Sequence, residues 1–194
     1  MLGVNWLYFD IETERTAQEV GGWHNIEQLG LACAVTHSSL SDEFRVYRKS
    51  DIPALLEELR CADCLVGFNS IGFDFRVLQT WADFDLSALP HLDLILDIKG
   101  VAGYRVGLNN LCEATFGARK SSNGLEAIQW WRDGREQEVI DYCRHDVLLT
   151  RQLHEHGARN GWVKCLDRAK KPRTLNINWC LERHGSAALQ GSLF

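Results

Sequence analysis

Two carboxylates end an apolar run near the start of the chain, in the stretch YFDIET that covers residues 8–13. Residues 4–9 carry the aromatic and branched side chains typical of a strand, and strands keep charge away from their buried faces. Because side chains alternate along a strand, Asp10 and Glu12 point to the same side, about 6–7 Å apart. Like charges this close repel each other unless a cation lies between them. The pair therefore indicates a metal site, although a solvated turn is the alternative for the two residues taken alone.

Two further acids stand in settings that fit the same site. Asp74 follows a short apolar run and a turn that contains Asn69. In DYCRHD, residues 141–146, Tyr142 and Asp146 are four positions apart, which stacks them on one face of a helix. Carboxylates in this number, with no histidine or thiol required, suit Mg²⁺ or Mn²⁺ rather than zinc or copper. Taken singly, Asp74 could be an acid at a helix N-terminus, and Tyr142 an ordinary core or surface aromatic.

The three pieces together resemble a known family. FDIET, then NSIGFD at residues 69–74, then Tyr142-x-x-x-Asp146 are similar in order and spacing to the three exonuclease motifs of the DEDDy 3′–5′ exonucleases. The spacing within the second motif is most similar to the proofreading domains of family B DNA polymerases. The resemblance covers about residues 4–155. It implies an α/β, ribonuclease-H-like fold with a mixed five-stranded sheet flanked by helices, and hydrolysis of phosphodiester bonds from the 3′ end of a single strand.

The resemblance also implies a role for each residue of the motifs. Asp10, Glu12 and Asp146 would hold the first Mg²⁺ or Mn²⁺ ion, and Asp10 with Asp74 would hold the second. Two such ions stabilise the attacking and leaving oxygens of a phosphodiester displacement. Tyr142 would orient the attacking water.

The neighbours of the motifs supply the candidate substrate contacts, which are Thr13, Asn69, Phe73 and Lys120. Asn69 could instead stabilise its turn, and Phe73 could be a core residue. Lys120 does not belong to an ATP loop, because Arg119 stands where a phosphate-binding loop requires glycine. Position 141 is an aspartate, which argues against the related subtype that uses a histidine base. Trp130 and Trp131 could stack on bases or could be buried by an amphipathic helix.

Composition limits the class of protein. Of the 194 residues, 45% are hydrophobic and 24% charged, which fits one soluble domain with its own core. We expect a single exonuclease domain over 1–194, with a motif core at about 4–155 and a C-terminal extension over 158–194. The sequence shows no membrane span and no export signal. Seven cysteines, an odd number without a secretion signal, indicate reduced thiols and a cytoplasmic protein.

The charge is unevenly distributed. The formal net charge of −5 does not by itself indicate a nucleic-acid partner. The C-terminal extension nevertheless contains a basic segment, in which one acid, Asp167, stands against Arg159, Lys164, Arg168, Lys170, Lys171 and Arg173. Such a segment is either a solvated face or an edge that tracks phosphates.

The pattern of apolar residues predicts strands that come first and then alternate with helices. The expected strands are 4–9, 27–37, 42–48 and 64–68, and the expected helices are 52–62, 72–83, 107–117, 125–131 and 135–157. Asp51 is the expected N-cap of the first helix. CADC, residues 61–64, has the spacing of zinc ligands, but no second pair completes it, so two buried thiols are the better interpretation.

A proofreading domain is part of a polymerase, whereas 194 residues leave no room for one. We therefore expect a free-standing copy that acts on a single-stranded 3′ end, of DNA ahead of RNA. Its partner would be a separate helicase or a repair or replication protein, and no membrane is involved. Two alternatives stay open, namely a non-catalytic nucleic-acid-binding module on the same fold and an endonuclease.

Overall fold

The computed structural model describes residues 4–118, 124–167 and 169–179, so the predicted substrate contact Lys120 lies outside the described residues. Five strands form one mixed sheet in the order β3-β2-β1-β4-β5. β2 runs antiparallel to β1 and β3, whereas β4 and β5 run parallel to β1. The bounds are β1 Trp6–Glu12, β2 Cys33–Ser38, β3 Glu43–Tyr47, β4 Cys64–Gly67 and β5 His91–Asp93. The predicted α/β class with a mixed five-stranded sheet is confirmed.

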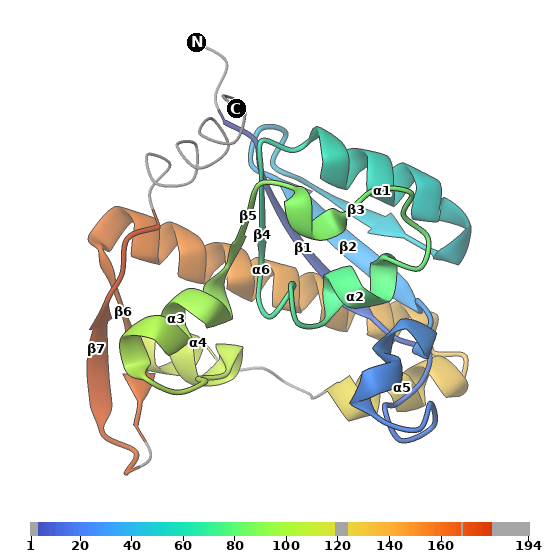
Figure 1. Ribbon diagram of the computed structural model, residues 1–194. Coiled ribbons are helices and arrows are strands. Elements are labelled where there is room, and N and C mark those ends of the chain that lie inside the picture. Colours follow the sequence, from blue (N-terminus) through green and yellow to red (C-terminus); the bar gives the residue numbers. More distant parts are fainter. Residues whose placement is uncertain (1–3, 119–123, 168, 180–194) are drawn as a thin grey trace.

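Helices cover both faces of this sheet (Figure 1). The long helix α6 packs against β1 and β2 on one face, and α1 and α2 lie on the other. The helices are α1 Ile52–Cys61, α2 Asp74–Leu78, α3 Leu94–Ala102, α4 Leu108–Phe116, α5 Gly124–Arg132 and α6 Glu136–Asn160. The described residues also include 3-10 turns between β1 and β2 (η1 Trp23–Gln28), between β3 and α1 (η2 Lys49–Asp51) and between α2 and β5 (η3 Leu86–Ala88). A separate hairpin of β6 (Trp162–Leu166) and β7 (Pro172–Asn176) packs beside α3 and α4.

The core has two halves because β1 alternates its side chains between the faces of the sheet. Leu7, Phe9 and Ile11 pack with the side chains of α1 and α2. Tyr8 packs with the side chains of α6 on the other face. The same alternation continues to the end of β1, so it directs Asp10 and Glu12 toward α6.

Several predicted boundaries are wrong, and the backbone explains two of them, one by strand pairing and one by its conformation. The strand expected over 4–9 continues to Glu12, because residues 10–12 pair with Val35, Ala34 and Cys33. The strand expected over 27–37 begins only at Cys33. Before it the chain passes through η1 and through Gly30, whose φ of +72° leaves the extended region. A side chain there would also collide with Glu14.

Other differences concern helices and small elements. The helix expected over 72–83 is only α2, Asp74–Leu78. Neither β5 with α3 nor the β6–β7 hairpin was predicted. Asp51 occupies the predicted N-cap position of α1, but within the described residues its side chain makes no capping hydrogen bond there and instead accepts the Arg48 N–H at 2.9 Å. Of the two thiols expected to be buried, Cys64 is buried at the start of β4, but Cys61 is exposed at the end of α1.

The remaining global features are simple. The six described cysteines are free thiols. Among the described helices, none combines the length and the hydrophobicity needed to cross a membrane.

Candidate active site

β1 carries the first two acids of the site. Asp10 pairs with Val35 and Glu12 pairs with Cys33 in β2, so both acids lie on regular strand backbone. The intervening Ile11 is buried against the opposite layer. Asp10 and Glu12 are therefore half-buried neighbours on the α6 side of the sheet, as the alternation of side chains requires.

α6 brings a third acid to the same place. Asp146 is buried on the stripe of α6 that faces the sheet, together with Val139, Cys143 and Val147. One carboxylate oxygen from each of Asp10, Glu12 and Asp146 lies within 4.8 Å of the other two, close enough for all three to bind a single ion. Side chains far apart in sequence thus converge on one point, and hard oxygen donors in this number suit Mg²⁺ or Mn²⁺.

Tyr142 lies one helical turn before Asp146 and shares its environment. The pKa of its hydroxyl is raised, first by burial and then by the negative charges of Asp146, Glu12 and Asp10. A hydrogen bond with Asp146 adds to the rise. The hydroxyl is therefore protonated at neutral pH and is placed beside the three carboxylates. The edge of the Trp130 ring packs on the Tyr142 ring, with centroids 6.2 Å apart.

Asp74 has a different position from the other three acids. Its side chain is only 3% exposed at the start of α2. Its Oδ1 accepts a hydrogen bond from the Ile11 N–H at 3.1 Å, which ties α2 to β1 between the two acids of that strand. Burial, with smaller contributions from the charges of Asp93 and Asp146, raises the pKa of Asp74 to about 8. The fourth carboxyl thus lies beside the group of three and not within it.

Cys143 is a neighbour of the site that the sequence analysis missed. Its buried thiol donates to the carbonyl oxygen of Asp10 at 3.2 Å and approaches the Asp10 Oδ2 at 3.5 Å. Burial raises the pKa of this thiol, so it stays protonated and acts as a donor. Its signal in the sequence was only that of an apolar position, because the contact joins β1 to α6.

The turn after β4 fixes Asn69, and a missed acid, Asp93, holds that turn. The buried Asp93 carboxylate accepts the backbone N–H groups of Asn69 at 2.8 Å, Ile71 at 3.0 Å and Ile95 at 3.2 Å. Asn69 adopts a φ of +71°, a left-handed conformation that asparagine tolerates better than most residues. Its side-chain oxygen accepts a hydrogen bond from Arg105 at 2.6 Å.

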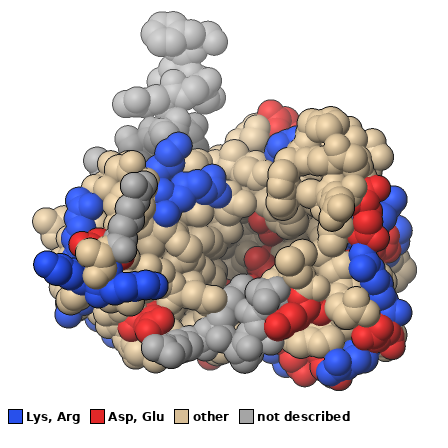
Figure 2. Space-filling view, turned by 90° about the horizontal axis from the view of Figure 1, so that it is seen from below, with Lys and Arg blue, Asp and Glu red and all other residues tan. Residues whose placement is uncertain are grey.

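A cleft of about 710 Å³ opens next to the acids. Its lining includes Asp10, Glu12 and Asp74, and also the predicted substrate contacts Thr13, Asn69 and Phe73. Figure 2 shows the molecule from this side, with a hollow that has acidic atoms inside it and basic side chains along one flank. The Thr13 hydroxyl is already engaged, because it donates to the Arg15 carbonyl oxygen at 3.1 Å.

The rim of the cleft carries an aromatic residue that the sequence analysis did not single out. Trp23 lies in η1, is 66% exposed and contacts the Phe73 ring edge-on, with centroids 6.4 Å apart. Leu125 of α5, 70% exposed, also lines the cleft. Trp130 and Trp131, the tryptophans considered for base stacking, instead pack partly buried against the core.

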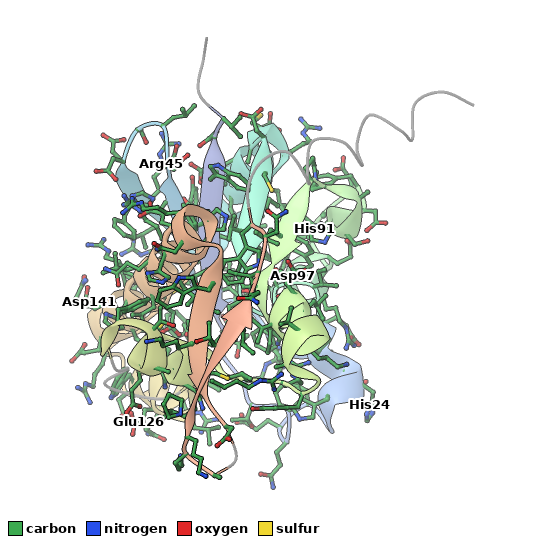
Figure 3. The ribbon with its side chains drawn as sticks, turned by 90° about the vertical axis from the view of Figure 1, so that its left-hand side faces the viewer. His24, Arg45, His91, Asp97, Glu126 and Asp141 are labelled. Carbon is green, nitrogen blue, oxygen red and sulfur yellow. The ribbon has the colours of Figure 1, made fainter. Side chains whose placement is uncertain are left out.

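Position 141 lies away from the cleft. Asp141 is exposed on the outer side of α6, where it accepts a hydrogen bond from the Gln137 side chain at 3.0 Å. Figure 3 shows Asp141 at the outer edge of the molecule. A base at this position of the helix would point to solvent, whereas Tyr142 points to the acids.

Comparison with known proteins agrees with this fold. A family model of the RNase_H superfamily matches residues 7–157, so the chain belongs to that superfamily and its fold is ribonuclease-H-like. The matched region includes Asp10, Glu12, Asp74 and Asp146 and ends before the β6–β7 hairpin. No match was found among curated proteins.

Among solved structures, the chain is similar to the family B DNA polymerase from the hyperthermophilic archaeon Pyrobaculum calidifontis, with a TM-score of 0.60 and 15% identity. The alignment covers 80% of this chain and 24% of the polymerase chain. The chain thus spans about a quarter of the polymerase's length. At this identity the likeness concerns the fold, and it fits the family in which the motif spacing was recognised.

Proposed function

We propose that this protein is a metal-dependent 3′–5′ exonuclease of the DEDDy type, which hydrolyses phosphodiester bonds at the 3′ end of a single strand. The observation that carries the proposal is the convergence of Asp10, Glu12 and Asp146 within 4.8 Å, beside a cleft and next to the Tyr142 hydroxyl. Membership of the RNase_H superfamily supports nuclease chemistry on this fold. The order of the three sequence motifs supports the finer assignment.

The donor set fits two divalent ions. Asp10, Glu12 and Asp146 would hold one, and Asp10 with Asp74 would hold the other. When bound, the ions supply positive charge that stabilises the scissile phosphate and the leaving oxygen. The carboxylates themselves fix where that charge lies. Their attraction for a cation favours metal binding, and relief of their mutual repulsion adds to it.

The other residues of the cleft would position the substrate. Tyr142 keeps its proton, so it would orient the attacking water by hydrogen bonding and would not act as a base. Asn69 and Phe73 would hold the last nucleotides. The exposed Trp23 ring beside Phe73 would give a terminal base a surface for stacking, which is sequence-tolerant because every base has a π-face.

Labelled oligonucleotides test the proposal directly. Single-stranded DNA and RNA, labelled at either end, are incubated with the protein in Mn²⁺ or Mg²⁺, and the product ladder is followed over time. We expect stepwise shortening from the 3′ end that EDTA abolishes. A terminal 3′ phosphate should protect the strand, whereas a blocked 5′ end should not.

Three controls separate this proposal from other activities of the fold. Rapid cutting of a circular single strand would mean an endonuclease. Binding of the oligonucleotides without cutting, and without a thermal shift in Mg²⁺ or Mn²⁺, would mean a non-catalytic module. Cutting activity that does not co-elute with the protein on a final sizing column would come from a contaminating nuclease.

A further inference from the structure

The β6–β7 hairpin contains most of the basic segment and is held firmly against the domain. The side chain of Asn110 in α4 makes two hydrogen bonds with the Leu166 backbone, at 2.9 and 2.7 Å. Thr115 does the same with the Lys164 backbone, at 3.2 and 3.0 Å. Polar side chains of a helix thus take the place of a neighbouring strand along β6. The hairpin is therefore a fixed part of the surface that can present charges at defined positions.

The turn of the hairpin carries two lysines, and among the described residues the acid nearest to them in the sequence, Asp167, forms no ion pair with either. The Asp167 Oδ1 accepts hydrogen bonds from two N–H groups of the turn itself, those of Ala169 at 2.8 Å and Lys171 at 2.9 Å. Lys170 and Lys171 are both exposed. No carboxylate of the described residues forms an ion pair with either lysine.

Two arginines connect this turn with the cleft. Arg173 in β7 donates from Nη1 to the Ala102 carbonyl oxygen at 3.1 Å, and Arg105 donates to the Asn69 side chain at 2.6 Å. Ala102, which Arg173 contacts, and Arg105 are three positions apart in the chain. Three residues of chain span at most about 10 Å. The two arginines therefore lead from the rim of the cleft toward the hairpin.

Elsewhere on the described surface, several cations are matched by acids. Ion pairs join Arg45 to Glu58, Arg48 to Glu136, Lys49 to Glu14, Arg60 to Glu57, Arg132 to Glu19, Arg135 to Glu138 and Arg151 to Asp42. Among described residues, Arg105, Lys170, Lys171 and Arg173 have no such pair, and neither have Arg15, Arg76, Lys99, Arg144, Arg159 and Lys164. The first four differ from the others in their place, because they lie between the cleft rim and the hairpin turn. Figure 2 shows the corresponding gathering of basic side chains on the hairpin side of the hollow.

We propose that Arg105, Arg173, Lys170 and Lys171 form a phosphate-binding track from the cleft rim to the β6–β7 turn. This track, which rests on the proposed function, would hold the backbone of the single strand whose 3′ end lies in the cleft. The chain as a whole carries a charge of −5 and so repels nucleic acid. A local row of cations opposes that repulsion and gives long strands an advantage over short ones.

The test compares affinities for oligonucleotides of two lengths. Fluorescence anisotropy in Ca²⁺ measures binding of about 4-nucleotide and about 20-nucleotide single strands, as DNA and as RNA, over a range of salt. The test variant is Lys170→Ala/Lys171→Ala. The control is Arg159→Ala/Lys164→Ala, which removes the same charge from the same basic segment. Arg159 lies at the other end of the hairpin, in the last turn of α6, and Lys164 packs over the Trp162 ring.

We expect the test variant to bind the long strand about tenfold more weakly while the ratio of long-strand to short-strand affinity falls by a similar factor. The slope of log affinity against log salt should shrink by about 1.4, for two lost phosphate contacts on a single strand. DNA and RNA should behave alike, because the contact is to phosphate. The control variant should keep the wild-type ratio.

The other outcomes are decisive too. If both double variants keep the wild-type ratio while the wild-type chain still cuts, the track is wrong and the nuclease function stands. An equal loss for both lengths would place the lysines' effect in the cleft or in folding, which also overturns the track. If the protein binds long strands through these lysines but cuts nothing, the track stands and the proposed function fails. Absence of binding at both lengths contradicts both.

Discussion

Three carboxylates within 4.8 Å of one another destabilise the protein unless a cation compensates them. Nothing in the packing requires this arrangement, because the same positions on β1 and α6 could carry amides of similar shape. Asp146 is also buried, which adds the cost of removing its charge from water. The residues of the cleft thus favour binding of metal over stability of the empty fold.

Removing one of these carboxylates should separate activity from stability. Asp10→Ala or Asp146→Ala deletes a ligand of the proposed first ion, so nuclease activity should fall below about a tenth of wild type. Relief of repulsion should leave the melting temperature of the metal-free protein unchanged or raised. Activity and melting curves in EDTA measure the two effects. More than a tenth of the activity in both variants, with contamination excluded, contradicts the metal-site assignment.

Tyr142 gives a sharper test of the assigned chemistry. Tyr142→Phe keeps the ring packing against Trp130 and keeps the carboxylates, but removes the hydroxyl that would orient the water. We expect kcat to fall by about 10–1,000-fold, with substrate affinity little changed. A structural tyrosine would instead give normal turnover and a stability loss of about 1 kcal/mol or less. Single-turnover rates measured beside the melting temperature distinguish the two.

At the scale of elements, the turn between β4 and α2 depends on a residue of another strand. Asp93 accepts three backbone N–H groups, two of them within the turn that carries Asn69. Since the carboxylate is 4% exposed, water cannot replace it easily. The second motif of the site is therefore shaped by β5, an element of three residues.

Asp93→Ala should lower both stability and substrate affinity. Loss of the carboxylate leaves buried N–H groups unpaired, which should cost about 2–4 kcal/mol of unfolding free energy. Asn69 would lose its fixed conformation, so KM should rise more than kcat falls. Asp85→Ala is the matched control, because Asp85 accepts a Ser87 N–H at 2.9 Å on the exposed turn η3. If chemical denaturation shows equal losses for the two variants, Asp93 has no special role.

The sequence predicted the elements whose pattern is local and long enough to read. Apolar periodicity over ten or more residues predicted α1 and α6. The spacing of four residues between Tyr142 and Asp146 predicted that they lie on one face of α6. The three residues of β5 are too few to show alternation, so this strand was missed. The contact of Cys143 with Asp10 and that of Asp93 with Asn69 join distant segments. No local pattern encodes such contacts, although each acid of the three motifs could be recognised.

At the scale of the whole molecule, the charges are divided between two regions. The acids of the cleft lie within the part that matches the RNase_H superfamily, residues 7–157. The basic hairpin, β6 and β7, lies after it in the chain and beside it in space. Metal ions and hairpin would act on different phosphates, the ions at the scissile bond and the lysines on the strand behind it. Such a separation of charges would allow a protein with a negative net charge to bind a nucleic-acid strand.

The metal-free protein should become less stable as pH rises. In the unfolded chain the Asp74 carboxyl loses its proton near pH 4, whereas in the folded protein burial raises its pKa to about 8. Between these values the folded state binds more protons than the unfolded state, so raising the pH lowers the free energy of unfolding. His37 acts in the opposite sense, because burial lowers its pKa and its protonation favours the unfolded chain at acidic pH.

The Asp74→Asn variant isolates the contribution of Asp74, since asparagine can still accept the Ile11 N–H but does not titrate. Melting temperatures of both proteins in EDTA are measured from pH 5 to pH 8. We expect the wild-type value, relative to the variant, to decline steadily over this window, while effects of His37 and of exposed groups cancel in the difference. Adding Mg²⁺ or Mn²⁺ at pH 8 should restore the wild-type protein more than the variant, because the ions compensate the charge that burial disfavours. A difference that stays constant with pH would show that Asp74 is already ionised in the folded metal-free protein, and its place beside the three other carboxylates would then need a different cause.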